Sequence, residues 1–164
     1  MRVRHIRPDD DGLLVEFFDR LSLETRQQRF MTTREHVPAE EVQREARRLA
    51  VIDPRYEAAL VAVVEEHGAE RIVGVARFVG SPDDPQLAEF AIVIRDDYQR
   101  EGLGSILLDL LIQVALARGI DCLVGVTLLE NTGIQRLVRR LGLPLSIQTR
   151  RGETTMTIRL GFDD

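Results

Sequence analysis

Apolar residues along the chain follow two spacings, and these alternate from one segment to the next. Continuous or alternating apolar segments predict β-strands, whereas apolar residues three and four positions apart predict amphipathic helices. The mixture of the two predicts an α+β fold. The predicted strands span residues 1–7, 58–64, 72–79, 87–94, 122–128, 143–149 and 154–160, and the predicted helices span residues 13–21, 22–30, 38–49, 102–118 and 131–141.

The 164 residues contain no internal repeat, low-complexity tract or long linker, so we expect a single domain over residues 1–164. The apolar runs are well short of the roughly 18 residues that a membrane span requires. The N-terminus alternates polar residues where a signal peptide would be continuously apolar, and we expect a cytoplasmic protein that does not bind membranes. The formal net charge of -5 argues against nucleic-acid binding through a basic surface.

A glycine-containing segment, residues 99–105, separates an apolar strand from a long amphipathic helix. The first N–H groups of a helix have no acceptor within it and carry the positive end of the helix dipole, so they favour an anion. We expect the absent side chains of Gly102 and Gly104 to let a diphosphate approach closely, and Arg100 can add charge-assisted hydrogen bonds. A tight turn with special backbone angles is the alternative explanation of this Gly-x-Gly.

Two other nucleotide-binding motifs do not fit the sequence. All 22 residues counted as lysine or arginine are arginine, so the P-loop lysine that binds ATP phosphates is missing. A dinucleotide-binding fingerprint would need a third glycine where Leu107 stands, together with repeated βαβ units that the predicted order lacks. These absences argue against kinases, ATPases and Rossmann dehydrogenases.

One carboxylate, Glu89, interrupts the apolar strand predicted over residues 87–94. Such a residue can lie at the exposed edge of a sheet or pair with an arginine. It can also be a partly buried general base, because burial raises the pKa of a glutamate from about 4.3 toward neutrality. An amine substrate needs a base, since a lysine amine with a pKa of about 10.4 is protonated at neutral pH and must lose a proton before it attacks a thioester.

Gln99, Gly102 and Gly104 match the signature Gln/Arg-x-x-Gly-x-Gly/Ala, by which the chain resembles the GNAT superfamily of acyl-CoA-dependent N-acetyltransferases. The resemblance implies a GNAT-like fold, with helices flanking a mixed, mostly antiparallel central sheet. It implies acetyl-CoA as the acyl donor, with its diphosphate on backbone N–H groups and its pantetheine arm added along the strand. The implied cofactor residues are Gln99, Arg100, Glu101, Gly102, Leu103, Gly104 and Ser105 in the loop, Ile92, Val93 and Ile94 in the strand, and Asn131, which could instead cap its helix.

Residues 21–30 and 88–94 also resemble segments of bacterial protein lysine acetyltransferases that act on acyl-CoA synthetases. That resemblance implies Glu89 as the general base and direct attack of the amine on the thioester in a ternary complex. Many GNAT enzymes place a tyrosine four residues before the glycine of the final helix to protonate the leaving thiolate. That position is Val138 here, so water would take the place of this acid or no acid would be needed.

The leading hypothesis is transfer of acetyl from acetyl-CoA to a primary amine, with a protein lysine, such as one of an acyl-CoA synthetase, favoured by the resemblance alone. A small-molecule amine is the alternative acceptor, and a non-catalytic acyl-CoA sensor is the alternative function. A sensor has no need for a carboxylate within an apolar strand, which favours an enzyme. The three histidines lack metal-ligand spacing and predict no metal site. Both a monomer and a homodimer remain open.

Overall fold

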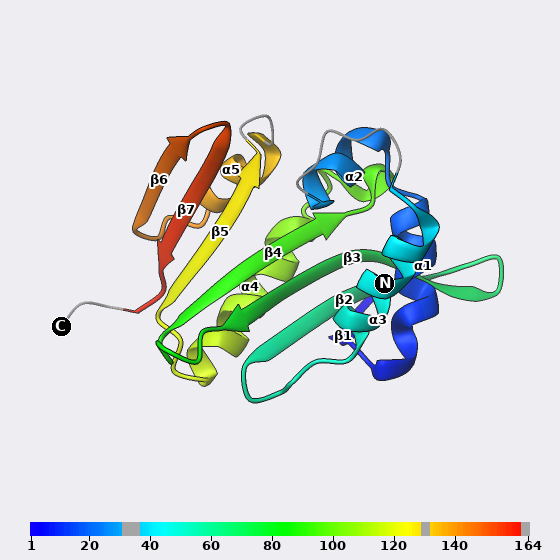
Figure 1. The fold of residues 1–164 in the computed structure, drawn as a ribbon, viewed down its shortest axis with the longest axis horizontal. Helices are drawn as coiled ribbons and strands as arrows, with labels where there is room; N and C mark the ends of the chain where they lie inside the picture. The colour runs from blue at the N-terminus through cyan, green and yellow to red at the C-terminus, as the bar shows by residue number, and fades with distance from the viewer. Residues whose placement is uncertain (31–36, 129–131, 162–164) are drawn as a thin grey trace.

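A seven-stranded sheet forms the centre of the protein (Figure 1) in a computed structural model that describes residues 1–30, 37–128 and 132–161. The strand order is β1-β2-β3-β4-β5-β7-β6, and every neighbouring pair is antiparallel except β4 and β5. The predicted α+β architecture with a mixed, mostly antiparallel sheet is therefore confirmed. The strands are β1 (Arg2–His5), β2 (Glu57–Glu66), β3 (Ala69–Gly80), β4 (Leu87–Ile94), β5 (Cys122–Leu128), β6 (Leu145–Arg150) and β7 (Glu153–Arg159).

The hairpin of β2 and β3 is tighter than the sequence pattern predicted. Polar residues 65–71 suggested a seven-residue connection, but the pairing continues to Glu66 and Ala69 and leaves only a two-residue turn. The two turn residues, His67 and Gly68, have φ angles of 53° and 78°. Positive φ at both positions is what a two-residue hairpin with right-handed strand twist requires, and Gly68 adopts it without steric cost.

Three helices of the N-terminal half lie on one side of the molecule (Figure 1): α1 (Asp11–Asp19), α2 (Leu23–Phe30) and α3 (Ala39–Ala50). The apolar faces of α1 and α3 pack with the inward side chains of β2 and β3 in one continuous core. Ser22 caps α2, because the backbone N–H of Thr25 donates to Ser22 Oγ at 3.1 Å. No helix in the described part of the chain is long and apolar enough to cross a membrane.

The long helix α4 (Leu103–Ala117) covers the other face of the sheet and packs against β2, β3 and β4. A glycine of β3 allows its N-terminal end to lie close to the sheet, since a Cβ on Gly74 would be 2.9 Å from Leu107 Cδ1 and 3.4 Å from Leu103 Cδ2. The helix start, with the loop before it, is thereby held at the C-terminal end of β4. The shorter α5 (Thr132–Arg139) follows β5, and the β6–β7 hairpin completes the sheet.

Candidate functional site

The parallel pair of β4 and β5 is short and forms the apex of a fork in the sheet. It joins Leu87 to Cys122 and ends where Glu89 pairs with Val124. Beyond that point the two strands diverge (Figure 1), while β4 stays paired with β3 as far as Ile94. Within the described residues, no strand covers the β5-facing edge of β4 after Glu89. Part of the backbone of β4 therefore faces the fork without a strand partner.

A glycine and an aromatic ring stand where the two strands separate. Phe90 is buried, and a Cβ on Gly125 would lie 2.7 Å from its Cε1 atom. The ring therefore lies directly against the backbone of β5, in space that any other residue at position 125 would fill. Sequence reasoning missed both residues, although a glycine within the apolar segment 122–128 is a signal of close approach.

A cleft of about 640 Å³ extends from this fork to the start of α4. Its walls come from the open edge of β4, the start of α4, β5, α5 and the first turn of α2. Glu101 and Leu103 do not line it, and Asn131 lies outside the described residues. The predicted cofactor residues that do line it are Ile92, Val93, Ile94, Gln99, Arg100, Gly102, Gly104 and Ser105.

The loop before α4 presents unpartnered backbone donors to the cleft. Arg100 and Gly102 have φ angles of 64° and 88°, and Gly102 occupies the N-cap position without a side-chain cap. The first hydrogen bond of the helix is donated by Ile106 N to Gly102 O at 3.2 Å. The N–H groups of the three residues between them consequently have no acceptor within the helix. These N–H groups can donate to an anion such as the diphosphate of CoA.

The two loop glycines differ in what surrounds them. A Cβ on Gly102 would have nothing within 4 Å, so its positive φ is the reason for glycine there. A Cβ on Gly104 would be 3.2 Å from Leu137 Cδ2 of α5. The expectation that both positions are small chiefly to admit a diphosphate is therefore incomplete, because Gly104 also allows α4 and α5 to pack closely. The buried side chain of Leu103 holds the first turn of α4 on the core.

Three arginines line the cleft around the helix starts: Arg100 in the loop, and Arg136 and Arg140 on and just after α5. Arg136 and Arg140 are four residues apart and so lie on one face of the helical turn. Arg139, between them, is exposed and does not line the cleft. This wall, which also carries the free N–H groups of α4, is the electropositive side of the cleft.

Glu89 lies at the apex of the fork, as the last residue of β4 that pairs with β5. The expectation of partial burial is wrong, because its side chain is exposed. Strand alternation places Glu89 on the face opposite the buried Ala88 and Phe90. The core formed by α1 and α3 reaches that face of β4 at Val93, four residues further along the strand, and does not include Glu89. Among the described residues, its carboxylate has no hydrogen-bond or ion-pair partner, which also excludes an arginine pair there.

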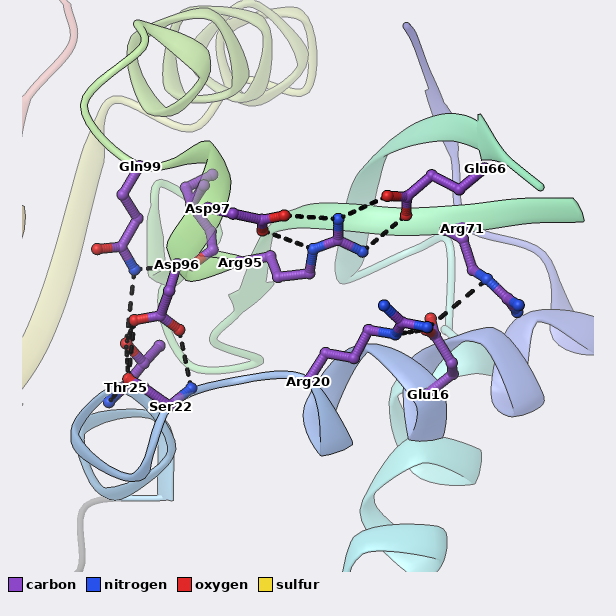
Figure 2. Close-up of polar contacts among 11 residues, drawn as sticks. Glu16, Arg20, Ser22, Thr25, Glu66, Arg71, Arg95, Asp96, Asp97 and Gln99 are labelled. Atoms are coloured by element: carbon purple, nitrogen blue, oxygen red, sulfur yellow. Dashed lines mark hydrogen bonds and ion pairs between the residues drawn. The ribbon is translucent and has the colours of Figure 1, made fainter.

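The first turn of α2, across the fork from α5 (Figure 1), forms another wall of the cleft, which sequence reasoning did not place at the site. Glu24 and Thr25 line the cleft from this turn. Figure 2 shows how the turn is attached: Asp96 accepts hydrogen bonds from Ser22 N (2.8 Å), Ser22 Oγ (2.7 Å) and Thr25 Oγ1 (2.8 Å). Burial by itself raises the pKa of Asp96, but these hydrogen bonds outweigh it and lower the pKa below its ordinary value of 3.8.

Asp96 belongs to the short 3-10 turn Asp96–Tyr98 that joins β4 to the glycine loop, and a buried arginine fixes this turn. Arg95 is 3% exposed and donates to Glu66 at 2.9 Å and to Asp97 at 2.7 Å (Figure 2). The hydrogen bonds from Arg95 lower the pKa of both carboxyl groups. Gln99 completes the connection, because its Nε2 donates to Ile94 O at 2.9 Å and to Thr25 Oγ1 at 3.5 Å.

No tyrosine, histidine or cysteine is among the described residues that line the cleft. Val138, at the position where many GNAT enzymes have a tyrosine, is 1% exposed and packs in the core. The described part of the chain also holds no group of acidic, histidine or cysteine side chains that could bind a metal ion.

Comparisons with known proteins agree with this geometry. Residues 19–143 match the Acetyltransferase (GNAT) family. An acetyltransferase of Pseudomonas aeruginosa is 35% identical over 141 residues, which are 85% of this chain and 73% of that protein. The acetyltransferase Pat of Mycolicibacterium smegmatis is 33% identical over 82 residues, 50% of this chain and 25% of that protein.

Among solved structures, the GNAT domain of PAT from S. lividans superposes with a TM-score of 0.80. It is 24% identical in sequence, and the alignment covers 96% of this chain and 89% of that one. At that identity the likeness shows the fold, whereas the match to the family and the Pseudomonas relative show the membership. The chain belongs to the GNAT family and is an acetyl-CoA-dependent acetyltransferase.

Proposed function

We propose that the protein transfers acetyl directly from acetyl-CoA to a primary amine, with Glu89 as the general base and a protein lysine as the acceptor. The observation that carries the proposal is the position of Glu89 at the apex of the fork. A pantetheine arm laid along the open edge of β4 from the loop at residues 99–105 would deliver its thioester end toward this apex. The carboxylate that lies there has no partner among the described residues and is free to accept a proton.

Different residues of the cleft would bind different parts of acetyl-CoA. The N–H groups of residues 103–105 and the three arginines would hold the diphosphate and phosphate groups of the donor. The backbone of residues 92–94 would pair with the pantetheine arm as a strand does. The acetyl thioester supplies the group that is transferred. The acceptor class is supported by the likeness of residues 21–30 and 88–94 to bacterial protein lysine acetyltransferases.

The proposed reaction balances without a further reagent. The amine nitrogen attacks the thioester carbonyl, its surplus proton passes to Glu89, and the bond from the carbonyl carbon to sulfur breaks. The thiolate of CoA leaves and takes its proton from water, because the described part of the cleft has no tyrosine, histidine or cysteine. Glu89 then returns to water the proton that it accepted, so that one proton has moved from the amine to the thiol and the carboxylate is restored. A thiol is far less basic than an amine, so a missing acid should slow the reaction less than a missing base.

The test is thiol release from acetyl-CoA with an acyl-CoA synthetase, Nα-acetyl-lysine amide and spermidine as acceptors, for the wild type and Glu89→Gln. We expect kcat of the Glu89→Gln enzyme to fall about 100-fold or more, because a general base contributes about 10²–10⁴-fold. The Kd of CoA, measured by calorimetry, should stay within about twofold. Glu153→Gln is the matched control, since Glu153 is an exposed strand glutamate of β7 and does not stand at the β4–β5 fork, and its loss should change neither quantity. Neither Glu153 nor Glu89 lines the cleft itself.

Each contrary result has a distinct meaning. Full activity of Glu89→Gln would remove the residue from the mechanism. Turnover with spermidine but not with the synthetase or the lysine derivative would identify a small-molecule acetyltransferase. Tight binding of CoA without turnover of any acceptor would point to an acyl-CoA sensor.

A further inference from the structure

The cleft has walls of opposite charge. Arg100, Arg136 and Arg140 stand at the loop and α5. The two carboxylates that line the described part of the cleft are Glu24, in the first turn of α2, and Asp96, in the 3-10 turn that is hydrogen-bonded to it. A direct transfer requires both reactants in the cleft together, and the wall of arginines and free N–H groups suits the anionic donor. The wall at α2 is then left for the acceptor, whose ammonium form carries the charge that Glu24 attracts.

The position of that wall depends on a small number of polar contacts. Among the described side chains, the long-range hydrogen bonds of Ser22 and Thr25 all end on Asp96 and Gln99 (Figure 2). Both oxygens of Asp96 are engaged: Oδ1 accepts from Ser22 N, and Oδ2 accepts from Ser22 Oγ and Thr25 Oγ1. Within the described residues, the Arg26 guanidinium donates to the carbonyls of Asp19 and Leu21, immediately before its own helix.

The residues that hold the first turn of α2, Asp96 and Gln99, belong to a rigid segment that continues into the donor-binding loop at residues 99–105. Asp96 follows the buried Arg95, which is held by Glu66 and Asp97. Gln99 links the same loop to the last carbonyl of β4 and to Thr25. One short turn therefore carries both the donor-binding loop and the attachment of α2.

We propose that Asp96 is a positioning residue for the acceptor: it fixes the first turn of α2 against the donor-binding turn, so that Glu24 and Thr25 form the wall that receives a cationic amine. This inference rests on the proposed amine acetyltransferase activity for the identity of the reactant at α2. The attachment of α2 by Asp96 does not depend on that activity and can be measured without it.

The first measurement is amide hydrogen exchange of residues 23–30 in wild type, Asp96→Ala, Asp96→Asn and the control Asp97→Asn. We expect about tenfold faster exchange in Asp96→Ala and a smaller increase in Asp96→Asn, because an amide retains one acceptor oxygen. Asp97→Asn removes the charge of the neighbouring carboxylate, which contacts Arg95 and not α2. Glu66 still holds Arg95 in this variant, so the exchange should rise much less than in Asp96→Ala. Equal exchange in wild type and Asp96→Ala would overturn the attachment.

The second measurement is steady-state kinetics with the acyl-CoA synthetase and Nα-acetyl-lysine amide as acceptors. Asp96→Ala should raise the KM of the acceptor about five- to tenfold and leave the KM of acetyl-CoA and the Kd of CoA within about twofold. Thr25→Val, which keeps the branched shape but removes the hydroxyl, should change the same acceptor KM in the same direction. This variant keeps the test decisive if Asp96→Ala does not fold.

The outcomes separate this inference from the function on which it rests. An unchanged acceptor KM in both variants, or an equal rise in the KM of acetyl-CoA, would overturn the acceptor role of Asp96 while leaving the transferase intact. Absence of turnover in the wild type with every amine would overturn the proposed function and the acceptor role together. In that case the exchange measurement still decides whether Asp96 attaches α2.

Discussion

At the scale of single residues, Gly102 and Gly104 stand two positions apart and are glycine for different physical reasons. Gly102 has a φ of 88° in open space, whereas a side chain at position 104 would meet Leu137. An L-residue in the left-handed region costs roughly 1–2 kcal/mol, and asparagine tolerates that region better than alanine. The same motif therefore combines a conformational requirement with a packing requirement.

We predict that Gly102→Ala lowers the free energy of unfolding by about 1–2 kcal/mol and weakens CoA binding, because the loop strains or shifts its N–H groups. Gly102→Asn should be milder in both respects. Denaturant unfolding and calorimetric titration of CoA measure the two effects. Equal losses for alanine and asparagine would mean that the side chain itself, and not the backbone angle, is what the position excludes.

The sequence was sufficient to locate the loop and Glu89 but not to describe their surroundings. Glu89 looked partly buried because its neighbours in sequence are apolar, yet strand alternation and the limited reach of α1 and α3 leave it exposed. Burial depends on which elements cover a strand, and the sequence pattern does not state this. Gly125 was missed for a related reason, since its partner Phe90 comes from another strand.

At the scale of elements, α5 presents its arginines unequally. Arg136 and Arg140 line the cleft, and Arg139 does not. Periodicity predicted the helix over residues 131–141 but does not distinguish these three arginines. Only the packing of α5 on α4, through Leu137 against Gly104, decides which side of the helix faces the cleft.

We predict that the double variant Arg136→Gln/Arg140→Gln raises the Kd of CoA about tenfold, because each charged hydrogen bond to a phosphate is lost. Arg139→Gln should have little effect, although it removes the same charge from the same helix. Titration with CoA and with dephospho-CoA, which lacks the 3′-phosphate, measures the specific contact. A similar loss for both ligands would assign the arginines to the diphosphate instead.

The positions of the strands and helices were predicted more successfully than the contacts between them. Strand and helix positions followed from apolar spacing, and the main error was the length of β2 and β3 around their turn at His67 and Gly68. The attachment of α2 to the site could not be predicted, because Ser22 and Thr25 are 74 and 71 residues from Asp96. Polar contacts at such a separation follow from the fold and leave no local pattern.

At the scale of the whole molecule, the chain is an acetyltransferase without a lysine of its own. All 22 residues counted as lysine or arginine are arginine. Arginine keeps its charge under all ordinary conditions, so its guanidinium does not become the neutral nucleophile that attacks a thioester. The protein thus presents no side-chain amine to the reagent that it binds.

We predict that long incubation with acetyl-CoA produces no stable acetylation of this chain beyond its N-terminal amine, because it has no lysine. Intact-mass spectrometry measures the number of additions, and a lysine-containing protein of similar size is the control for chemical acetylation. One addition at the N-terminal amine is compatible with the prediction. Several stable additions would contradict it and would show that hydroxyl or other groups react.

The fork between β4 and β5 also affects how the protein behaves without its donor. A sheet with an open edge in its interior is a template for the extended backbone of another chain, and natural proteins generally cover such edges. A ligand that binds only the folded state stabilises it in proportion to the logarithm of its concentration. Acetyl-CoA would thus be a reactant and also the ligand that covers the open edge of β4. At a low concentration of acetyl-CoA the enzyme would be inactive and, at the same time, more prone to self-association.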